Sequence, residues 1–358
     1  MKLKKLILLF SLIAAGLLLS GCSGRSTVPS SWPGITIVDN IAYVAFNNHV
    51  YGVQINNGSQ LSRMPDKPIN TTTTFFHQPL MMDETTLIVG DYKKEIYTFN
   101  TANRTTEVFF NDASGRWIAA PLLVDETIYA PNADNFVYAL NLDGSLKWTF
   151  ETGDPIWSAP LINDDLLYIA SMDGSLYALE ADRGSVVWQT ELGGTVVNNA
   201  HFGDDGVLYI GTFSSEMLAL DSQTGSILWR FTTDDWVWGT PILYDGVLYV
   251  TDLSGKVYAV DPLEHNILWQ YKADGAISGS VLVVEDSLYV ASQGGTIYSL
   301  NTSGTLRWQA SLSEEEGEFA GTPIAVDNSI LIGALQTESI LYAYNTEGTL
   351  QWQFTPEN

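Results

Sequence analysis

Acidic pairs are the residues of this 358-residue sequence that could most readily do chemistry, because carboxylate oxygens are preferred ligands of calcium. The pairs are Asp83-Glu84, Asp125-Glu126, Asp164-Asp165, Asp204-Asp205 and Glu285-Asp286. Their spacing does not match an EF-hand loop, and all five occupy one place in a repeat, between two short apolar segments. Acidic residues at such a place favour tight turns. We therefore interpret the pairs as turns and predict no metal site.

Other catalytic patterns are missing from the sequence. The histidines are His49, His77, His201 and His265, and none pairs with another at the spacing of a zinc motif. No serine lies in a G-x-S-x-G elbow, and Gly255-Lys256 lacks the rest of a phosphate-binding loop. We therefore expect no catalytic residue.

The phrase LYALEADRGSVVWQ, residues 176–189, belongs to a unit that occurs eight times in variant form. Six copies end in a tryptophan, and successive tryptophans are 39 to 44 residues apart: Trp148, Trp188, Trp229, Trp269, Trp308 and Trp352. The first two copies have Ser62 and Val108–Phe109 at this place. A period near 40 residues indicates a repeat architecture.

Each unit is predicted to contain four short strands, which in the fourth unit span 159–162, 166–171, 175–179 and 186–190. The second strand is a continuous apolar run, which is typical of a strand buried on both faces. The pattern predicts an all-β, eight-bladed β-propeller of four-stranded antiparallel blades over residues 35–358; a solenoid is the alternative. Small residues at the start of each unit fit innermost strands that converge on the axis. We expect the ring to close by packing of the last blade on the first, without a shared blade.

The units resemble the PQQ-like β-propeller repeat. The resemblance lies in Tyr-Ala-Leu, an acidic turn, a glycine and a tryptophan 10 or 11 residues after the tyrosine position, and it covers residues 35 to 355. It implies that the six tryptophans dock against the neighbouring blade and are structural. The units lack the Gly-His and Trp-Asp signature of WD40 repeats.

The resemblance implies two classes of function. One is a PQQ-dependent quinoprotein dehydrogenase, which would bind PQQ with calcium over the propeller axis. The other is a non-catalytic protein, which we favour for two reasons. A chain with one cysteine cannot form the disulfide that often stacks on PQQ, and the chain lacks the extra length that usually carries the substrate pocket of such enzymes. The layout also resembles the lipoprotein subunit of the outer-membrane protein assembly machine. That likeness implies a scaffold that binds a protein partner.

The N-terminus is predicted to be a targeting segment. Residues 1–21 carry a basic head and a short apolar run, as in a secretory signal peptide. Leu19-Ser20-Gly21-Cys22 resembles a lipobox, which implies lipidation at Cys22, the only cysteine. Residues 22–34 then form a lipidated tether. In a host with two membranes, Ser23 after the cysteine implies the periplasmic face of the outer membrane.

Charge and aromatic residues limit the partners. The net charge of −25 excludes nucleic acid, which requires clustered Lys and Arg. We expect a monomeric propeller that binds an envelope protein, with an envelope polysaccharide as the alternative ligand.

Aromatic residues in the links between blades form the candidate interaction face; they could equally plug the central channel. They are Phe75, Phe76, Trp117, Trp157, Trp236, Trp238 and Phe319. The acidic turns are expected to form a ring on the opposite face.

Overall fold

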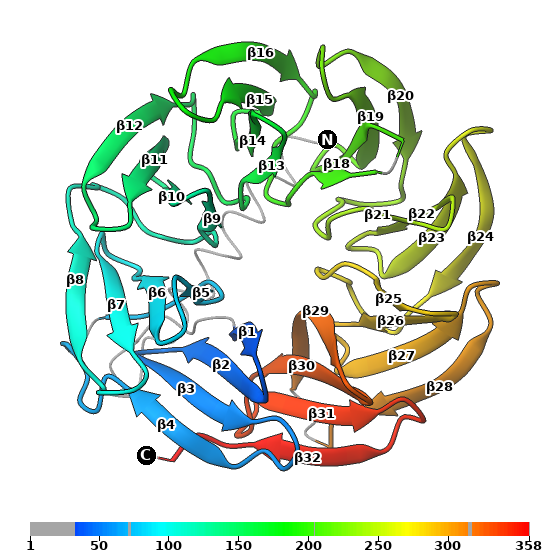
Figure 1. The fold of residues 1–358 in the computed structure, drawn as a ribbon. Coiled ribbons are helices and arrows are strands. Elements are labelled where there is room, and N and C mark those ends of the chain that lie inside the picture. The colour runs from blue at the N-terminus through cyan, green and yellow to red at the C-terminus, as the bar shows by residue number, and fades with distance from the viewer. Residues whose placement is uncertain (1–32, 71–72, 204, 314–316, 358) are drawn as a thin grey trace, which may run out of the picture.

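The structure is a computed structural model that describes residues 33–70, 73–203, 205–313 and 317–357. Within these ranges every regular element is a strand, and the strands form eight four-stranded sheets around a central axis (Figure 1). Every pairing is antiparallel and joins strands that are consecutive in sequence. The predicted all-β, eight-bladed propeller is therefore confirmed.

Blades 1 to 4 contain the first sixteen strands. Blade 1 comprises β1 (Gly34–Val38), β2 (Ile41–Phe46), β3 (His49–Gln54) and β4 (Gln60–Met64). Blade 2 comprises β5 (Leu80–Met81), β6 (Thr86–Gly90), β7 (Ile96–Asn100) and β8 (Thr106–Phe110). Blade 3 comprises β9 (Leu122–Val124), β10 (Thr127–Pro131), β11 (Phe136–Asn141) and β12 (Leu146–Glu151). Blade 4 comprises β13 (Leu161–Asn163), β14 (Leu166–Ala170), β15 (Ser175–Glu180) and β16 (Val186–Glu191).

Blades 5 to 8 contain the remaining sixteen strands. Blade 5 comprises β17 (His201–Phe202), β18 (Val207–Thr212), β19 (Glu216–Asp221) and β20 (Ile227–Thr232). Blade 6 comprises β21 (Ile242–Tyr244), β22 (Val247–Thr251), β23 (Lys256–Asp261) and β24 (Asn266–Lys272). Blade 7 comprises β25 (Leu282–Val284), β26 (Ser287–Ala291), β27 (Thr296–Asn301) and β28 (Leu306–Ser311). Blade 8 comprises β29 (Glu318–Val326), β30 (Ser329–Leu335), β31 (Leu341–Asn345) and β32 (Leu350–Phe354).

The acidic pairs form the turns between the first and second strands of their blades. Asp125, Asp164 and Glu285 have φ values of 46°, 51° and 53°, in the left-handed region that Asp and Asn tolerate better than most side chains. Asp83 instead accepts hydrogen bonds from the backbone amides of Thr85 and Thr86 at 2.8 and 2.9 Å. The turn interpretation of the described pairs is confirmed.

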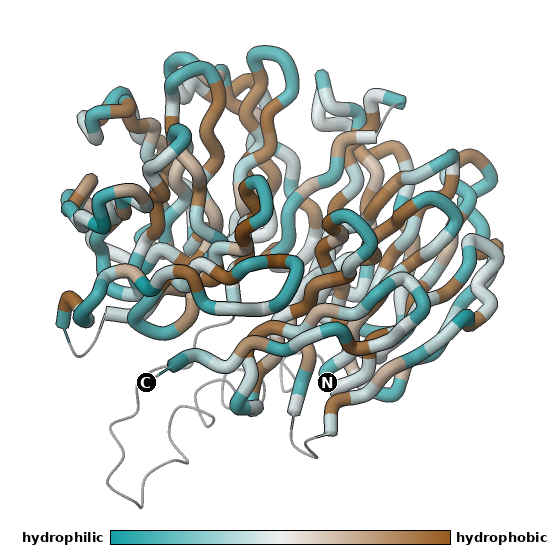
Figure 2. Tube along the Cα trace, turned by 60° about the horizontal axis from the view of Figure 1, so that its bottom comes forward, coloured by the Kyte–Doolittle hydropathy of each residue, from teal (hydrophilic) through white to brown (hydrophobic). Residues whose placement is uncertain are grey.

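The hydrophobic core lies between adjacent sheets. Each cluster of buried side chains combines residues of two neighbouring blades; Leu176 and Ala178 of blade 4, for example, pack with Leu208 and Leu218 of blade 5. Apolar residues follow the strands and polar residues follow the turns (Figure 2). Because the second and third strands are covered on both sides, their sequences are apolar without alternation.

The innermost strands approach one another too closely for side chains at one position. A Cβ atom added to Gly239 would overlap the carbonyl oxygen of Gly279, and one added to Gly279 would overlap that of Gly321. These glycines come from three successive links, so the inner backbones of blades 6, 7 and 8 are nearly in contact. The small residues at the start of each unit are a consequence of this convergence.

The repeated tryptophans join each blade to the next on the outer side of the ring. In five of the six, the indole Nε1–H donates a hydrogen bond to a backbone carbonyl in the following blade, at 2.6 to 3.1 Å. The acceptors are the oxygens of Ala181 for Trp148, Ser222 for Trp188, Thr302 for Trp269, Thr346 for Trp308 and Ile55 for Trp352. All five lie in turns between the third and fourth strands.

The same turns present a glycine to the indole ring. Gly184 and Gly225 adopt φ values of 69° and 70°, and a Cβ on either would reach 2.5 Å from the ring of Trp148 or Trp188. Glycine is therefore required at this position for two reasons: the backbone is left-handed, and the indole ring approaches too closely for a side chain. Trp229 differs, because it faces His265 and the two rings stack at 4.6 Å.

The ring closes by direct packing of blade 8 on blade 1. Trp352, near the C-terminus, donates its Nε1–H to the oxygen of Ile55 at 2.6 Å. Leu331 and Leu341 of blade 8 share a buried cluster with Val44 and Val53 of blade 1. Each of these blades contains strands from one end of the chain only, so closure without a shared blade is confirmed.

Replacing a docking tryptophan should destabilise the ring strongly. We expect Trp188→Ala to lower the free energy of unfolding by about 3 kcal/mol, because it removes a large side chain from the space between two blades and its hydrogen bond to Ser222. The matched control is Val187→Ala, whose side chain is 48% exposed in the same strand and which should cost less than about 0.5 kcal/mol. Urea unfolding followed by circular dichroism measures both. Equal effects would contradict the docking role.

Candidate functional site

Three of the seven aromatic residues predicted for the interaction face lie in the core. Phe75, Trp117 and Phe319 are 0%, 1% and 1% exposed. Each lies eight residues before the acidic position of the following turn, where other links have the buried apolar residues Ile156, Val196, Val237 and Ile277. Because this position points between two blades, these three residues cannot form an exposed interaction surface, and that part of the prediction is wrong.

The other four residues are half-buried and lie on the face that carries the links. They are Phe76, Trp157, Trp236 and Trp238. Two further half-buried aromatics, Tyr92 and Phe213, contact them from turns between second and third strands. We call these six residues the aromatic collar. The sequence analysis missed Tyr92 and Phe213; the available signal was an aromatic residue in a turn where other units have Ala133 or Gln293.

The collar contains two ring stacks. Phe76 stacks on Tyr92 at 4.6 Å, and the guanidinium of Arg116 lies 4.2 Å from the ring centre of Tyr92. Phe213 stacks on Trp236 at 4.7 Å, nearly parallel, and lies 5.3 Å from Trp238. Stacked aromatics joined to an arginine form a rigid, partly apolar surface of the kind enriched in protein interfaces.

Backbone hydrogen bonds place the turn aromatics beside the links. The amide of Tyr92 donates to the oxygen of Thr74 at 2.7 Å, and the amide of Phe213 donates to the oxygen of Thr195 at 2.9 Å. Both acceptors lie one residue before the buried apolar position of their link. The first bond places Tyr92 beside Phe76 of the same link. Phe213 stacks instead on Trp236 of the following link, which reaches this turn through a hydrogen bond from the amide of Val237 to the oxygen of Thr212 at 3.2 Å.

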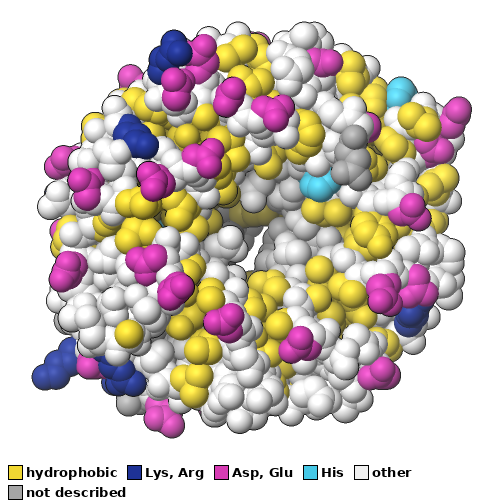
Figure 3. Space-filling view, viewed as in Figure 1, with side chains coloured by type: hydrophobic (Ala, Val, Ile, Leu, Met, Phe, Trp, Pro, Cys, Tyr) yellow, Lys and Arg dark blue, Asp and Glu magenta, His cyan; other side chains and the backbone are white. Residues whose placement is uncertain are grey.

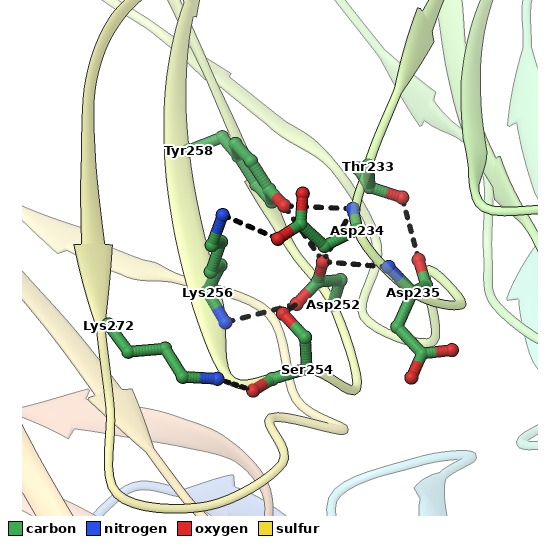
Figure 4. A network of polar contacts seen from close by, with 8 residues as sticks. All are labelled: Thr233, Asp234, Asp235, Asp252, Ser254, Lys256, Tyr258 and Lys272. Atoms are coloured by element: carbon green, nitrogen blue, oxygen red, sulfur yellow. Dashed lines mark hydrogen bonds and ion pairs between the residues drawn. The ribbon is translucent and has the colours of Figure 1, made fainter.

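A buried carboxylate fixes the link that carries Trp236. Asp252 is fully buried and accepts hydrogen bonds from the amides of Asp234 and Asp235 at 3.1 Å each, and from the hydroxyl of Tyr258 at 2.9 Å (Figure 4). Burial, with the nearby carboxylate of Asp252, raises the pKa of Tyr258 and keeps the hydroxyl a donor. The amide of Leu253 donates to the oxygen of Trp236 at 2.9 Å, which completes the attachment.

The collar surrounds one cavity of about 240 Å³. Phe76, Trp157 and Trp238 line the cavity together with Ile118 and Val197, from five successive links. The structure therefore brings together three residues that are far apart in sequence. The indole Nε1 of Trp157 is buried and has no hydrogen-bond partner among the described residues.

The opposite face of the ring is acidic. Figure 3 shows Asp and Glu side chains on all sides of a central opening, with few Lys or Arg side chains among them. The described acidic turn residues include Asp39, Asp125, Asp164, Asp245 and Asp327, each with φ between 46° and 52°. Asp204 lies outside the described residues.

The lining of the cavity does not fit PQQ with calcium. Calcium takes six to eight oxygen ligands, mainly carboxylates and carbonyls, whereas the cavity is lined by aromatic and aliphatic side chains with Gln78 and Asn199 as its polar members. Across the described ranges, no group of three or more His, Cys, Asp or Glu could hold a metal ion. We therefore derive no step through this cofactor.

His77 is the strongly perturbed base next to the collar. It is buried beside Phe76; its Nδ1 donates to the oxygen of Gln78 at 2.7 Å, and its Nε2 accepts from the amide of Gly90 at 2.8 Å. Burial lowers the pKa of His77 to about 4, although the hydrogen bond to Gln78 acts in the opposite direction. The neutral ring thus ties the second link to β6.

The targeting segment cannot be compared with the structure. Residues 1–21, Cys22 and most of the 22–34 tether lie outside the described residues, so lipidation stays a prediction. In the part of the chain that is described, no helix is long and apolar enough to cross a membrane.

The fold and the sequence together identify a class of protein. The chain is an eight-bladed propeller of PQQ-like repeats, and a family model described as "Outer membrane protein assembly factor BamB" matches residues 47–200 and 173–358. The chain belongs to this family. A comparison with curated protein sequences finds no significant match.

Two solved structures share the fold. The crystal structure of BamB from Moraxella catarrhalis superposes with a TM-score of 0.69 at 17% identity, covering 89% of this chain and 96% of that one. The crystal structure of the computationally designed Ika8 protein superposes with a TM-score of 0.72 at 13% identity, covering 91% and 96%. At these identities the likeness concerns the fold alone.

The buried His77 should make stability depend on pH. The folded protein keeps the ring neutral down to about pH 4, whereas the unfolded chain binds the proton near pH 6.5. Because the unfolded state holds more protons between these values, the stabilisation present above pH 6.5 should fall by up to about 3 kcal/mol as the pH decreases to 4. Urea unfolding at several pH values measures this change.

The control for His77 uses a residue that the repeat already accepts. Asn198 occupies the same position of the fifth blade's link and is buried there. We expect His77→Asn to remove most of the slope between pH 4 and 6.5. A slope that persists unchanged in this variant would show that other groups cause it.

Proposed function

We propose that this protein is a non-catalytic, lipid-anchored, extracytoplasmic scaffold that binds a protein partner in the assembly of outer-membrane proteins. Family membership and the lipobox at Cys22 support this proposal. The single observation that carries partner binding is the aromatic collar, in which six half-buried rings lie on one face and three of them line a cavity. The propeller acts as a monomer attached by its tether.

The collar favours a protein over other ligands. Four of its six rings are stacked in two pairs, so these side chains lose little entropy on binding. Arg116 and Tyr92 provide polar groups at the edge of the apolar surface, as at protein interfaces. The strongly negative net charge favours a partner segment that carries Lys or Arg around its apolar contact.

Site-specific crosslinking in membranes tests this proposal. A photoreactive phenylalanine analogue at Phe213 should form a crosslink to one protein, because the ring of Phe213 contacts both Trp236 and Trp238 in the collar. The same analogue at Tyr244, which is 40% exposed at the end of β21, is the control and should give no such product. Mass spectrometry of the crosslinked product identifies the partner.

Substitutions separate binding from stability. Trp236→Ala should lower the yield of the crosslink about tenfold while the thermal transition changes little, because loss of one interface aromatic typically costs more than about 1 kcal/mol of binding. Trp117→Ala should instead destabilise the fold, because its ring is buried between blades 2 and 3. Equal crosslinking from positions 213 and 244, a product containing polysaccharide without protein, or saturable calorimetric binding of PQQ with calcium would each contradict the proposal.

A further inference from the structure

We propose that a cavity at the junction of blades 8 and 1 binds the carboxylate group of a peptide, through the hydroxyl of Tyr51 and the guanidinium of Arg63. The cavity has a volume of about 630 Å³, which lies in the range of ligand-binding pockets. Its lining comes from β3, from β4 and from the turns that join second and third strands, on the collar side of the ring. The inference goes beyond the proposed function, because this cavity shares no lining residue with the aromatic collar.

The first observation concerns a tyrosine that recurs in the third strand of the blades. In four blades its hydroxyl donates a hydrogen bond to a carboxylate of the same blade. Tyr138 donates to Asp134 at 2.8 Å, Tyr177 to Asp173 at 2.6 Å and Tyr258 to Asp252 at 2.9 Å, and Tyr97 donates to Glu95. The repeat thus pairs this hydroxyl with an anionic group.

Tyr51 occupies this position in blade 1 but has no such partner. Gly52 pairs with Ser62, which stands at the tryptophan position of the blade. Tyr51 therefore corresponds to Tyr138, which precedes the residue that pairs with Trp148. The side chain of Tyr51 is only 6% exposed and lines the cavity, and no described residue makes a hydrogen bond with its hydroxyl. Burial raises the pKa of Tyr51, so the hydroxyl keeps its proton and offers the cavity a donor.

The local sequence of blade 1 explains why the carboxylate is missing. β2 and β3 are joined by two residues, Asn47 and Asn48, whereas the corresponding turns of blades 3 and 4 contain four residues with one aspartate. The residue before the apolar run of the third strand is Glu95 in blade 2 and Glu216 in blade 5, but His49 in blade 1. Burial lowers the pKa of His49, so its ring is neutral at pH 7. This part of blade 1 therefore provides no anionic group for Tyr51.

The second observation is an arginine beside the same hydroxyl. Arg63 stands directly opposite Tyr51 in the ladder of β3 and β4, which puts the two Cβ atoms about 5 Å apart on one face. The equivalent residue of blade 5 is Arg230, whose guanidinium pairs with Glu216 at 2.9 Å. Arg63 instead donates to two backbone oxygens, at 3.2 and 3.5 Å, and within the described ranges it forms no ion pair. In a chain with 41 acidic and 16 basic residues, such an arginine beside a cavity favours an anionic ligand.

The two groups together fit a carboxylate. A guanidinium can bind both oxygens of a carboxylate side by side, and the hydroxyl of Tyr51 adds a third donor. The carboxylate of Glu338 lines the wall that blade 8 contributes. This charge disfavours a phosphate group, which carries a charge of about −1.5 to −2 at pH 7, more than a carboxylate does. We therefore assign the site beside Tyr51 and Arg63 to a carboxylate.

The rest of the lining favours a peptide over a sugar acid. Phe46 and Ile340 line the cavity together with the ring of Tyr51. The hydroxyls of a sugar would lose hydrogen bonds to water against these apolar groups. An aliphatic side chain next to the carboxylate would instead bury apolar area there. A peptide supplies both parts, with the carboxylate either at its C-terminus or on an Asp or Glu side chain.

Titration of the full chain with small probes, followed by saturation-transfer NMR, tests the assignment. N-acetyl-leucine carries a carboxylate and an aliphatic side chain, and N-acetyl-leucinamide differs from it only in lacking the charge. We expect the acid to bind at least about tenfold more tightly, because hydrogen bonds to a charged group are the stronger ones. N-acetyl-glutamic acid α-amide shows whether a side-chain carboxylate binds as well as a terminal one. Equal affinities of acid and amide, or no binding of either carboxylate probe, would overturn the proposal.

Substitutions locate the binding site. Tyr51→Phe and Arg63→Gln should each weaken the binding of N-acetyl-leucine at least about fivefold, because each removes a donor to the carboxylate. Arg183→Gln is the matched control: it removes the same charge from an exposed position of blade 4 and should leave the affinity unchanged. Circular dichroism verifies that each variant is folded. Affinity that survives both substitutions in blade 1, or glucuronate bound as tightly as N-acetyl-leucine, would overturn the proposal.

A third variant supplies the carboxylate from within the chain. His49→Glu places it where blades 2 and 5 have Glu95 and Glu216, so it should compete with the ligand and lower the affinity for N-acetyl-leucine at least about tenfold. His49→Gln, the uncharged control, should keep most of the affinity. Equal losses in the two variants would overturn the proposal. None of these readouts involves the collar or the protein partner, so a failure here is distinct from a failure of the proposed function.

Discussion

The docking of one tryptophan on the following blade is the interaction on which the ring depends. Sheets that radiate from an axis diverge outwards, so each pair of blades leaves a wedge that grows towards the outer strands. An indole fills this wedge, and in five junctions its Nε1–H reaches a carbonyl of the next blade at 2.6 to 3.1 Å. The facing glycine is the other half of the contact, because a side chain there would overlap the ring.

The division between structural and functional aromatics follows from this arrangement. The outer tryptophans and the buried position of each link hold neighbouring blades together, and their ring positions are fixed by the repeat. One residue further along the link, side chains point into the channel and the repeat no longer restricts their identity. Phe76, Trp157 and Trp238 lie there, and Trp236 lies on the other side of the buried residue. Surface chemistry can therefore vary at these positions without loss of the fold.

The sequence predicted the fold well because the repeat samples each position eight times. The eight blades and the acidic turns followed from that repetition. The repeat also placed Ser62 at the tryptophan position of the first unit, and in the structure Ser62 pairs with Gly52. The candidate site was harder to predict. Phe75 and Phe76 are adjacent and both aromatic, yet one points between blades and the other into the channel. Alignment of the links by their turns would have separated them. The stacks of Tyr92 and Phe213 join a turn to a link, and no short sequence pattern predicts a contact between residues so far apart along the chain.

The most direct test of this account is hydrogen exchange of Trp352→Ala, because that tryptophan holds the two ends of the chain together. Mass spectrometry should show faster amide exchange in β1–β4 and β29–β32, the two blades that meet at the closure, with β13–β20 on the far side of the ring unchanged. Such local opening is expected when one junction of a ring weakens while the others persist. Exchange that is unchanged, or that rises equally in all blades, would contradict the claim that each tryptophan stabilises its own junction.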